Sequence, residues 1–191
     1  MEILEYYGVS AEFPGDSLVV FHAEDADGFF SAVRPLDGSL EGALKELADS
    51  GEIKGKSGQR ALLHTLGRIK PERVMVAGLG KKGEVNPEKI RSAVAECCKS
   101  LKQAGAKRVG VAVQYPELED ITVEVMARSV TEGAVLGLYI YDRHKETDEE
   151  RSEIAELHLM AADKRQRNSI IRGRERGEVS ADATMYARDM V

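Results

Sequence analysis

Apolar positions along this chain alternate between short runs typical of β-strands and longer stretches with helical spacing. Six runs predict strands: Glu2–Tyr7, Ser17–His22, 61–66, 73–77, 108–113 and 153–161. The run 108–113 is apolar almost throughout, as in a strand buried on both faces of a parallel sheet. In the last run Ile154 breaks strict alternation, so a short helix is the alternative to the strand that we favour.

The clearest helix prediction begins after Asn86, an N-cap residue that is followed by Pro87 and Glu88. Gly105 is expected to end it. Its apolar face is expected to consist of Ile90, Val94, Cys97, Cys98 and Leu101. This pattern predicts a helix that packs against a sheet.

Three further helices are predicted with less defined ends. One is expected after Ser39 as N-cap, with Gly51 just beyond its end. A second is expected from about Glu119, with apolar positions at Val123, Met126, Val130, Ala134 and Leu138. The third is expected from about Lys164 to the end of the chain, after a charged and solvated loop at 145–150.

The order of these elements predicts an α/β fold. Strands that alternate with helices, together with strands apolar on both faces, indicate a mixed, mostly parallel sheet with helices on both sides. The expected architecture is therefore a three-layer α/β/α sandwich.

Composition is that of a globular chain. Its 191 residues are 42% hydrophobic and 31% charged, which suits one domain with a sizeable core. No apolar run is long enough for a membrane-spanning helix, and the first residues do not resemble a secretory signal. The adjacent Cys97 and Cys98 suit neither a disulfide framework nor a zinc site, so we expect a cytoplasmic protein.

Charge is unevenly distributed along the chain. The net charge of −6 argues against a generic nucleic-acid-binding protein. Residues 164–177 nevertheless contain six basic side chains against the single acid Glu175: Lys164, Arg165, Arg167, Arg172, Arg174 and Arg176. We interpret this run as a solvated helix face or as a face toward an acidic neighbour, and DNA binding is the alternative.

A Gly-x-Gly sequence, Gly78 to Gly80, lies between a predicted strand and a predicted helix, and Lys81 and Lys82 follow it. Such a turn could present backbone N–H groups to a phosphate. The third glycine of the dinucleotide motif is missing, and the phosphate-loop spacing is not met. A tight turn is therefore the preferred interpretation.

Four side chains that could bind a cation, His22, Glu24, Asp25 and Asp27, follow the second predicted strand, but their spacing matches no calcium loop. His64 and His158 lie in strand-like runs, and His144 lies in the charged loop. One of the two mid-helix cysteines is expected to face the core, and neither is expected to react. We therefore predict no catalytic, cofactor-binding or metal-binding residue.

Three segments carry a resemblance to a known family. They are 73–113, with the Gly-Leu-Gly-Lys turn and the proline-started helix, then 132–145 (EGAVLGLYIYDRHK), and 183–191 (ATMYARDMV). Together they resemble the N-terminal domain of the leucyl (cytosol) aminopeptidase family. The third segment is the most specific, and the first is shared by many α/β domains.

The resemblance implies a macro-domain-like fold at 1–162 and a linker helix at 163–191 that leads to a catalytic domain absent from this sequence. It implies a hexameric, metal-dependent parent enzyme that removes N-terminal residues from peptides and holds two divalent ions, Zn or Mn. The family's Asn-Thr-Asp-Ala-Glu-Gly-Arg motif does not occur here, so no catalytic residue carries over.

A non-catalytic domain that packs on the catalytic domain of its parent is thus the expected role. Met185, Tyr186 and Met190 are expected to be exposed on the last helix. Two alternatives stay open: a macro-like module that binds ADP-ribose or a related nucleotide, and a DNA-binding accessory domain.

Overall fold

A computed structural model describes residues 1–139 and 153–190 of the chain. Its centre is a six-stranded sheet with the order β1-β6-β5-β2-β4-β3. The strands are β1 (Glu2–Tyr7), β2 (Ser17–His22), β3 (Arg60–His64), β4 (Arg73–Gly78), β5 (Arg108–Ala112) and β6 (Glu156–Ala161). All neighbouring pairs are parallel except β3 with β4, which is antiparallel.

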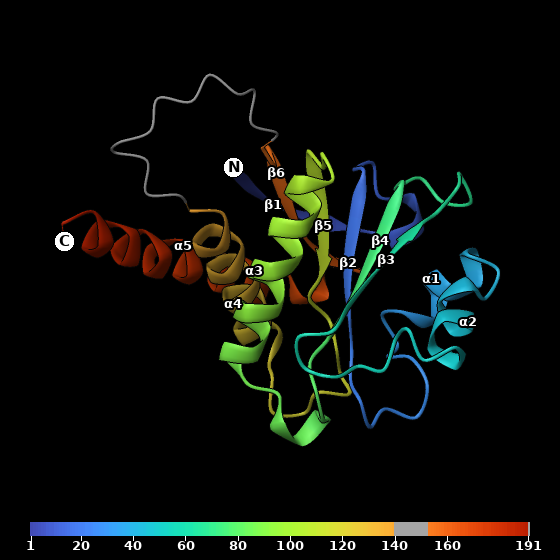
Figure 1. Ribbon diagram of the computed structural model, residues 1–191. Coiled ribbons are helices and arrows are strands. Elements are labelled where there is room, and N and C mark those ends of the chain that lie inside the picture. Colours follow the sequence, from blue (N-terminus) through green and yellow to red (C-terminus); the bar gives the residue numbers. More distant parts are fainter. Residues whose placement is uncertain (140–152, 191) are drawn as a thin grey trace.

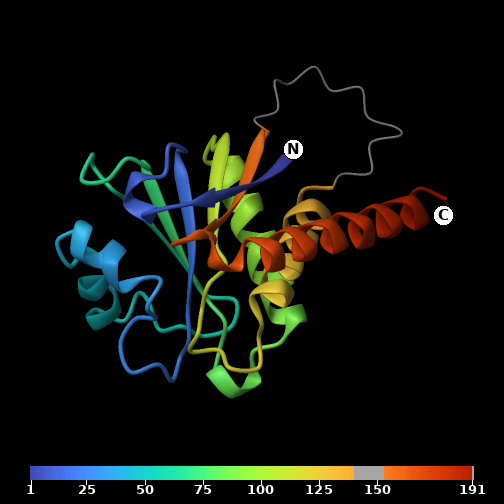
Figure 2. The ribbon, with the colours of Figure 1, turned by 180° about the vertical axis from the view of Figure 1, so that it is seen from behind.

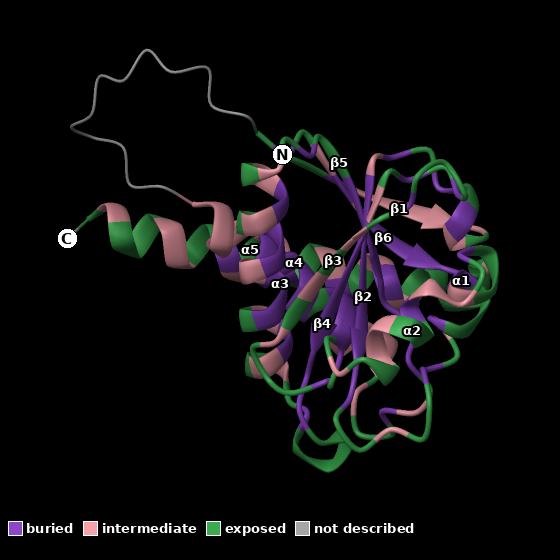
Figure 3. Ribbon diagram, turned by 45° about the vertical axis from the view of Figure 1, so that its right-hand side comes forward, coloured by how far each residue is buried: buried purple, intermediate pink, exposed green. Residues whose placement is uncertain are grey.

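Helices lie on both sides of the sheet (Figure 1). On one side are α3 (Pro87–Gln103), α4 (Val123–Leu138) and α5 (Arg167–Asp189), and on the other are the short helices α1 (Arg34–Ser39) and α2 (Ala43–Asp49). Every residue of β2 is buried, as expected for a central strand covered on both faces (Figure 3). The predicted three-layer α/β/α architecture with a mixed, mostly parallel sheet is therefore confirmed.

The strand predictions agree closely with the structure. β1 and β2 have the predicted bounds, and the ambiguous run near Ile154 forms a strand that starts at Glu156. The α3 prediction also holds, because Asn86 Oδ1 accepts the Lys89 N–H at 3.0 Å and caps the helix. The charged loop predicted at 145–150, with His144, lies outside the described residues.

Two helix starts were predicted wrongly. Ser39 ends α1 instead of capping a helix. The start of α2 is capped by Asp37 of α1, whose Oδ1 accepts the N–H groups of Leu44 and Lys45 at 2.9 and 3.1 Å. α4 starts at Val123, later than predicted, because the Thr122 hydroxyl caps it by accepting the Val125 N–H at 3.2 Å.

Glycines allow the three long helices to approach one another closely. A Cβ atom at Gly133 would lie 2.5 Å from the Arg91 carbonyl oxygen of α3. On the other side of α4, a Cβ at Gly173 of α5 would lie 2.4 Å from the Glu124 carbonyl oxygen. A Cβ at Gly177 would lie 2.7 Å from the Thr131 Cβ. α4 is thus packed at backbone distance on both of its sides.

The last helix begins with one 3-10 turn, Lys164–Gln166, before α5 proper. The Asp163 carboxylate caps this turn by accepting the Arg165 N–H at 2.8 Å. From there α5 packs on α4, and its C-terminal half extends beyond the sheet, as the front and back views show (Figures 1 and 2). No helix in the described ranges is both long and apolar enough to cross a bilayer.

Candidate functional site

A cleft of about 990 Å³ lies near the carboxyl ends of β1, β5 and β6. In open α/β sheets this edge is where ligands usually bind. Four segments form the walls: the turn after β1, the start of α1, the β5–α4 connection and the start of α5. Apolar side chains that line it include Val9, Leu36, Leu118, Ile121, Val123 and Met160.

The ionisable side chains of this cleft are few. Those that line it are Tyr115, Glu119 and Glu124, and the described lining contains no lysine, arginine or histidine. Tyr115 is buried, which raises the pKa of its hydroxyl, and that hydroxyl accepts the Phe21 N–H at 2.9 Å. The cleft is therefore largely apolar, with two carboxylates in its described lining.

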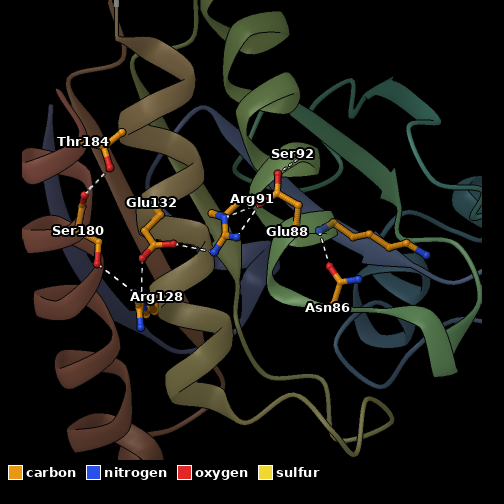
Figure 4. Close-up of polar contacts among 9 residues, drawn as sticks. Asn86, Glu88, Arg91, Ser92, Arg128, Glu132, Ser180 and Thr184 are labelled. Atoms are coloured by element: carbon orange, nitrogen blue, oxygen red, sulfur yellow. Dashed lines mark hydrogen bonds and ion pairs between the residues drawn. The ribbon is translucent and has the colours of Figure 1, made fainter. Parts of the chain in front are cut away.

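A network of polar contacts connects the three long helices on one side of the sheet (Figure 4). The side chain of Glu132 in α4 is only 6% exposed. Its two carboxylate oxygens form ion pairs with Arg91 of α3 at 2.9 Å and with Arg128 of α4 at 2.7 Å. Arg128 also donates to the Ser180 hydroxyl of α5 at 3.1 Å, and Arg91 pairs with Glu88 at 2.6 Å. This network joins three helices, and none of its side chains lines the cleft.

Four of the six basic side chains of the predicted run pair with carboxylates of the chain itself. Arg172 and Arg176 both pair with Glu124, at 2.9 and 2.6 Å. These contacts hold the pKa of Glu124 below its usual value. Arg174 pairs with Glu5 of β1 at 2.9 Å and donates to the Ile3 carbonyl, so it also covers the edge of the sheet.

The exposed side of α5 carries an apolar stripe. Val179, Tyr186 and Met190 are 70%, 68% and 68% exposed, and Ala183 lies between them on the same face. The spacing of these four residues puts them along one line of the helix. Met185, predicted to be exposed with Tyr186 and Met190, is half-buried instead.

The Gly78–Gly80 turn packs closely against neighbouring backbone. The N–H groups of Leu79 and Gly80 bond to the carbonyls of His22 and Gly55 at 2.9 and 2.8 Å. A Cβ at Gly78 would lie 2.1 Å from the Lys56 carbonyl oxygen, and Gly80 has a φ of +81°. The glycines are thus required by close backbone contacts and by one left-handed turn, as the preferred interpretation holds.

The candidate cation ligands after β2 do not converge. His22 is buried against the rings of Phe29 and Phe30, which lowers the pKa of its imidazole by desolvation. The Asp25 carboxylate accepts the Lys82 N–H at 2.8 Å. Among the residues described by the structure, no three His, Cys, Asp or Glu side chains are grouped so that they could hold a metal ion.

Both cysteines of α3 are fully buried, whereas the sequence indicated one. α3 is covered by the sheet and by α4, so two neighbouring faces of the helix are enclosed. Burial raises the pKa of the Cys97 thiol to about 12 and raises that of Cys98 as well. Such thiols are poor nucleophiles at neutral pH.

His158 and His64 lie in β6 and β3, as predicted. His158 Nε2 lies 2.8 Å from a Glu156 carboxylate oxygen, and its ring packs against Phe13. Sequence reasoning missed the cleft, whose lining comes from segments that meet only in the folded chain. The available signal was the parallel sheet itself, because connections after parallel strands gather at one edge.

The chain is similar to known proteins in both sequence and fold. Residues 19–148 match the cytosol aminopeptidase family, N-terminal domain. A probable cytosol aminopeptidase of Aquifex aeolicus is 29% identical over all of this chain, which covers 36% of that relative. In fold, the chain is similar to a mutant of tomato leucine aminopeptidase, with a TM-score of 0.74 at 20% identity, covering 97% of this chain and 37% of the tomato chain.

A Trypanosoma brucei macrodomain in complex with ADP is also similar in fold, with a TM-score of 0.67 at 10% identity, covering 90% of this chain and 68% of the macrodomain chain. This likeness supports the macro-domain-like description of the sheet and its helices. The chain spans about a third of the length of the curated relatives that it matches. It belongs to the cytosol aminopeptidase family and corresponds to the N-terminal domain of that family.

Proposed function

We propose that this chain is the non-catalytic N-terminal domain of a cytoplasmic aminopeptidase that releases N-terminal residues from peptides. The observation that carries the proposal is the family match over residues 19–148, together with relatives of which the chain covers only about a third. Peptide hydrolysis then belongs to the remaining part of the parent protein.

We propose that residues 1–162 form the macro-like domain and that residues 163–191 lead to the catalytic domain. The contacts of α5 support this division of roles. One side of α5 is fixed to α4 through Gly173 and Gly177, while Val179, Tyr186 and Met190 remain exposed on its other side. Covering three such side chains in the parent would bury apolar surface and stabilise the interface.

Two divalent metal ions, Zn or Mn, are proposed to be held by the catalytic domain, where they would polarise the scissile carbonyl and activate a water molecule. The described side chains of this chain do not fit such a centre, because they contain no group of metal-binding residues. We also propose that the parent enzyme assembles as a hexamer.

A chimaera tests the proposal. Residues 1–191 would be joined to the remaining part of the Aquifex aeolicus relative, which aligns over the whole of this chain. We expect the chimaera to release leucine from leucine p-nitroanilide when Mn²⁺ or Zn²⁺ is supplied, and the 191-residue chain alone to release none. Metal-dependent release by the chain alone would overturn the proposal.

A matched pair of variants tests the docking role of α5. In the chimaera, Tyr186→Glu should lower the melting temperature, because it places a charge in the covered stripe. Leu66→Glu is the control, since Leu66 is 82% exposed on the turn after β3, away from α5. Equal effects of the two substitutions would contradict docking through the stripe.

Nucleotide binding is a second candidate, and the cleft is the observation that favours it. The Trypanosoma brucei macrodomain is described in complex with ADP. The described lining contains no lysine or arginine that could pair with phosphate groups, however, so this candidate has less support than the first.

A further inference from the structure

The cleft at the carboxyl ends of β1, β5 and β6 is large enough for a small organic ligand. Its volume of about 990 Å³ is at the upper end of the range of small-molecule sites. The apolar residues of the lining offer a surface for an aliphatic or aromatic group. The chemical class of ligand then depends on the polar groups that remain available.

Most polar side chains around the cleft already have partners. Gln114 accepts the Ala162 N–H at 3.0 Å, and the Tyr115 hydroxyl accepts the Phe21 N–H. Both carboxylate oxygens of Glu124 are taken by Arg172 and Arg176. Within the described part of the chain, Glu119 is therefore the ionisable lining residue that has no hydrogen-bond or ion-pair partner.

The wall that contains Glu119 is acidic. The connection from Pro116 to Glu124 carries Glu117, Glu119, Asp120 and Glu124 and no basic residue. Glu117 is held ionised by its environment, since backbone hydrogen bonds and Arg34 lower its pKa despite the opposing effect of burial. Glu124 is paired with Arg172 and Arg176, and Glu117 lies 4.0 Å from Arg34, so Glu119 carries the unpaired negative charge of the described cleft lining. An unpaired carboxylate there favours a cation over a phosphate.

Donors are also present, at the start of α4. Val123 and Glu124 line the cleft, and as the first residues of a 16-residue helix they have N–H groups without intrahelical partners. The Thr122 cap takes the Val125 N–H and leaves these two available. They suit a neutral carbonyl oxygen, because an anion placed there would also face Glu119.

We propose that the cleft binds a primary ammonium compound that carries an apolar group next to a carbonyl, as at the N-terminal end of an apolar peptide. The ammonium group pairs with Glu119, the apolar group lies on the lining of Leu118, Ile121 and Met160, and the carbonyl accepts from the first turn of α4. This inference rests on the cleft alone, and it holds whether or not the parent protein hydrolyses peptides.

The test is a titration of the 191-residue chain followed by amide NMR at a pH slightly below neutral, where an α-amino group is protonated. The probes are leucinamide, N-acetyl-leucinamide and ADP. We expect leucinamide to shift the signals of residues 112–124 and 160–162 with millimolar affinity. N-acetyl-leucinamide, which keeps the apolar group and the carbonyl but lacks the charge, should bind more weakly.

Glu119→Gln and the neighbouring Asp120→Asn form a matched pair, because both remove one exposed charge but Asp120 does not line the cleft. We expect Glu119→Gln to weaken leucinamide binding about three- to fivefold, as for a partly exposed ion pair, and Asp120→Asn to leave it nearly unchanged. Equal effects of the two variants would overturn the proposal. So would the absence of cleft shifts with leucinamide, or ADP binding that is tighter than that of leucinamide.

Discussion

Because α5 approaches α4 closely at Gly173, we expect alanine at this position to destabilise the protein, whereas alanine in place of glycine stabilises an ordinary helix. Alanine in place of glycine normally stabilises a helix interior by about 1 kcal/mol. At Gly173 the added Cβ would lie 2.4 Å from the Glu124 carbonyl oxygen and 2.8 Å from the Ala127 Cβ. Neither neighbour is the end of a flexible side chain, so α5 must move away from α4.

The magnitude follows from two opposing contributions. Overpacking of a close contact costs typically about 1–3 kcal/mol, against about 1 kcal/mol gained in helix propensity. Displacement of α5 would also loosen the buried Ile170 and Ala181 and the ion pairs of Glu124. We therefore expect Gly173→Ala to lower the free energy of unfolding by up to about 2 kcal/mol.

Urea unfolding followed by far-UV circular dichroism measures the effect, and Gly38→Ala is the control. Gly38 is also helical, in α1, but a Cβ there would meet no atom within 4 Å. The helix-propensity contribution is similar in both variants, so the difference between them isolates the packing contribution. We expect Gly38→Ala to be neutral or stabilising. If Gly173→Ala proves equally stabilising, the close α4–α5 packing is wrong.

Three further predictions concern buried ionisable groups. Glu132→Gln should lower the free energy of unfolding by about 2–4 kcal/mol, because two arginines lose a buried partner. Glu96→Gln, which breaks an exposed pair, should lower it by less than about 0.5 kcal/mol. Equal losses of the two variants in urea unfolding would contradict the account. Burial lowers the pKa of His22 below 6.5, so below that pH the unfolded chain takes up a proton that folded His22 does not. The free energy of unfolding should therefore fall between neutral pH and about pH 5.5, before carboxylates titrate, and His22→Asn should reduce this fall; an unchanged pH dependence would refute the assignment. Cys97 and Cys98 should resist alkylation by iodoacetamide in the folded chain and react after unfolding in urea, and rapid labelling of the folded chain would show that they are accessible.

The sequence was sufficient wherever a local pattern and the tertiary structure favour the same element. The strands β1 and β2 follow from β-favouring apolar runs, and α3 follows from Asn86, Pro87 and an apolar face that repeats at helical spacing. In β2 and α3 the apolar residues of the pattern become buried, and in β1 Ile3 is buried whereas Leu4, Tyr6 and Tyr7 are partly buried. Local preference and burial therefore gave the same prediction.

Predictions failed where a contact between distant residues decides the outcome. The cap of α2 comes from Asp37, outside that helix, so Ser39 was mistaken for a cap. Cys97 and Cys98 are both buried because α4 covers a side of α3 that a single amphipathic pattern does not reveal. The pairing of Arg172 and Arg176 with Glu124 joins residues about 50 positions apart, which no local spacing rule predicts.

The central claim is that the chain acts as one domain of a larger metal-dependent aminopeptidase. Its most direct test is to immunopurify the native protein from the cells that express it, with antibody against this chain, and to measure its subunit mass and its release of leucine from leucine p-nitroanilide. We predict a subunit about three times the 20.9 kDa of this chain, in line with the relatives, and release that a chelator abolishes. A subunit of 20.9 kDa without such release would contradict the account.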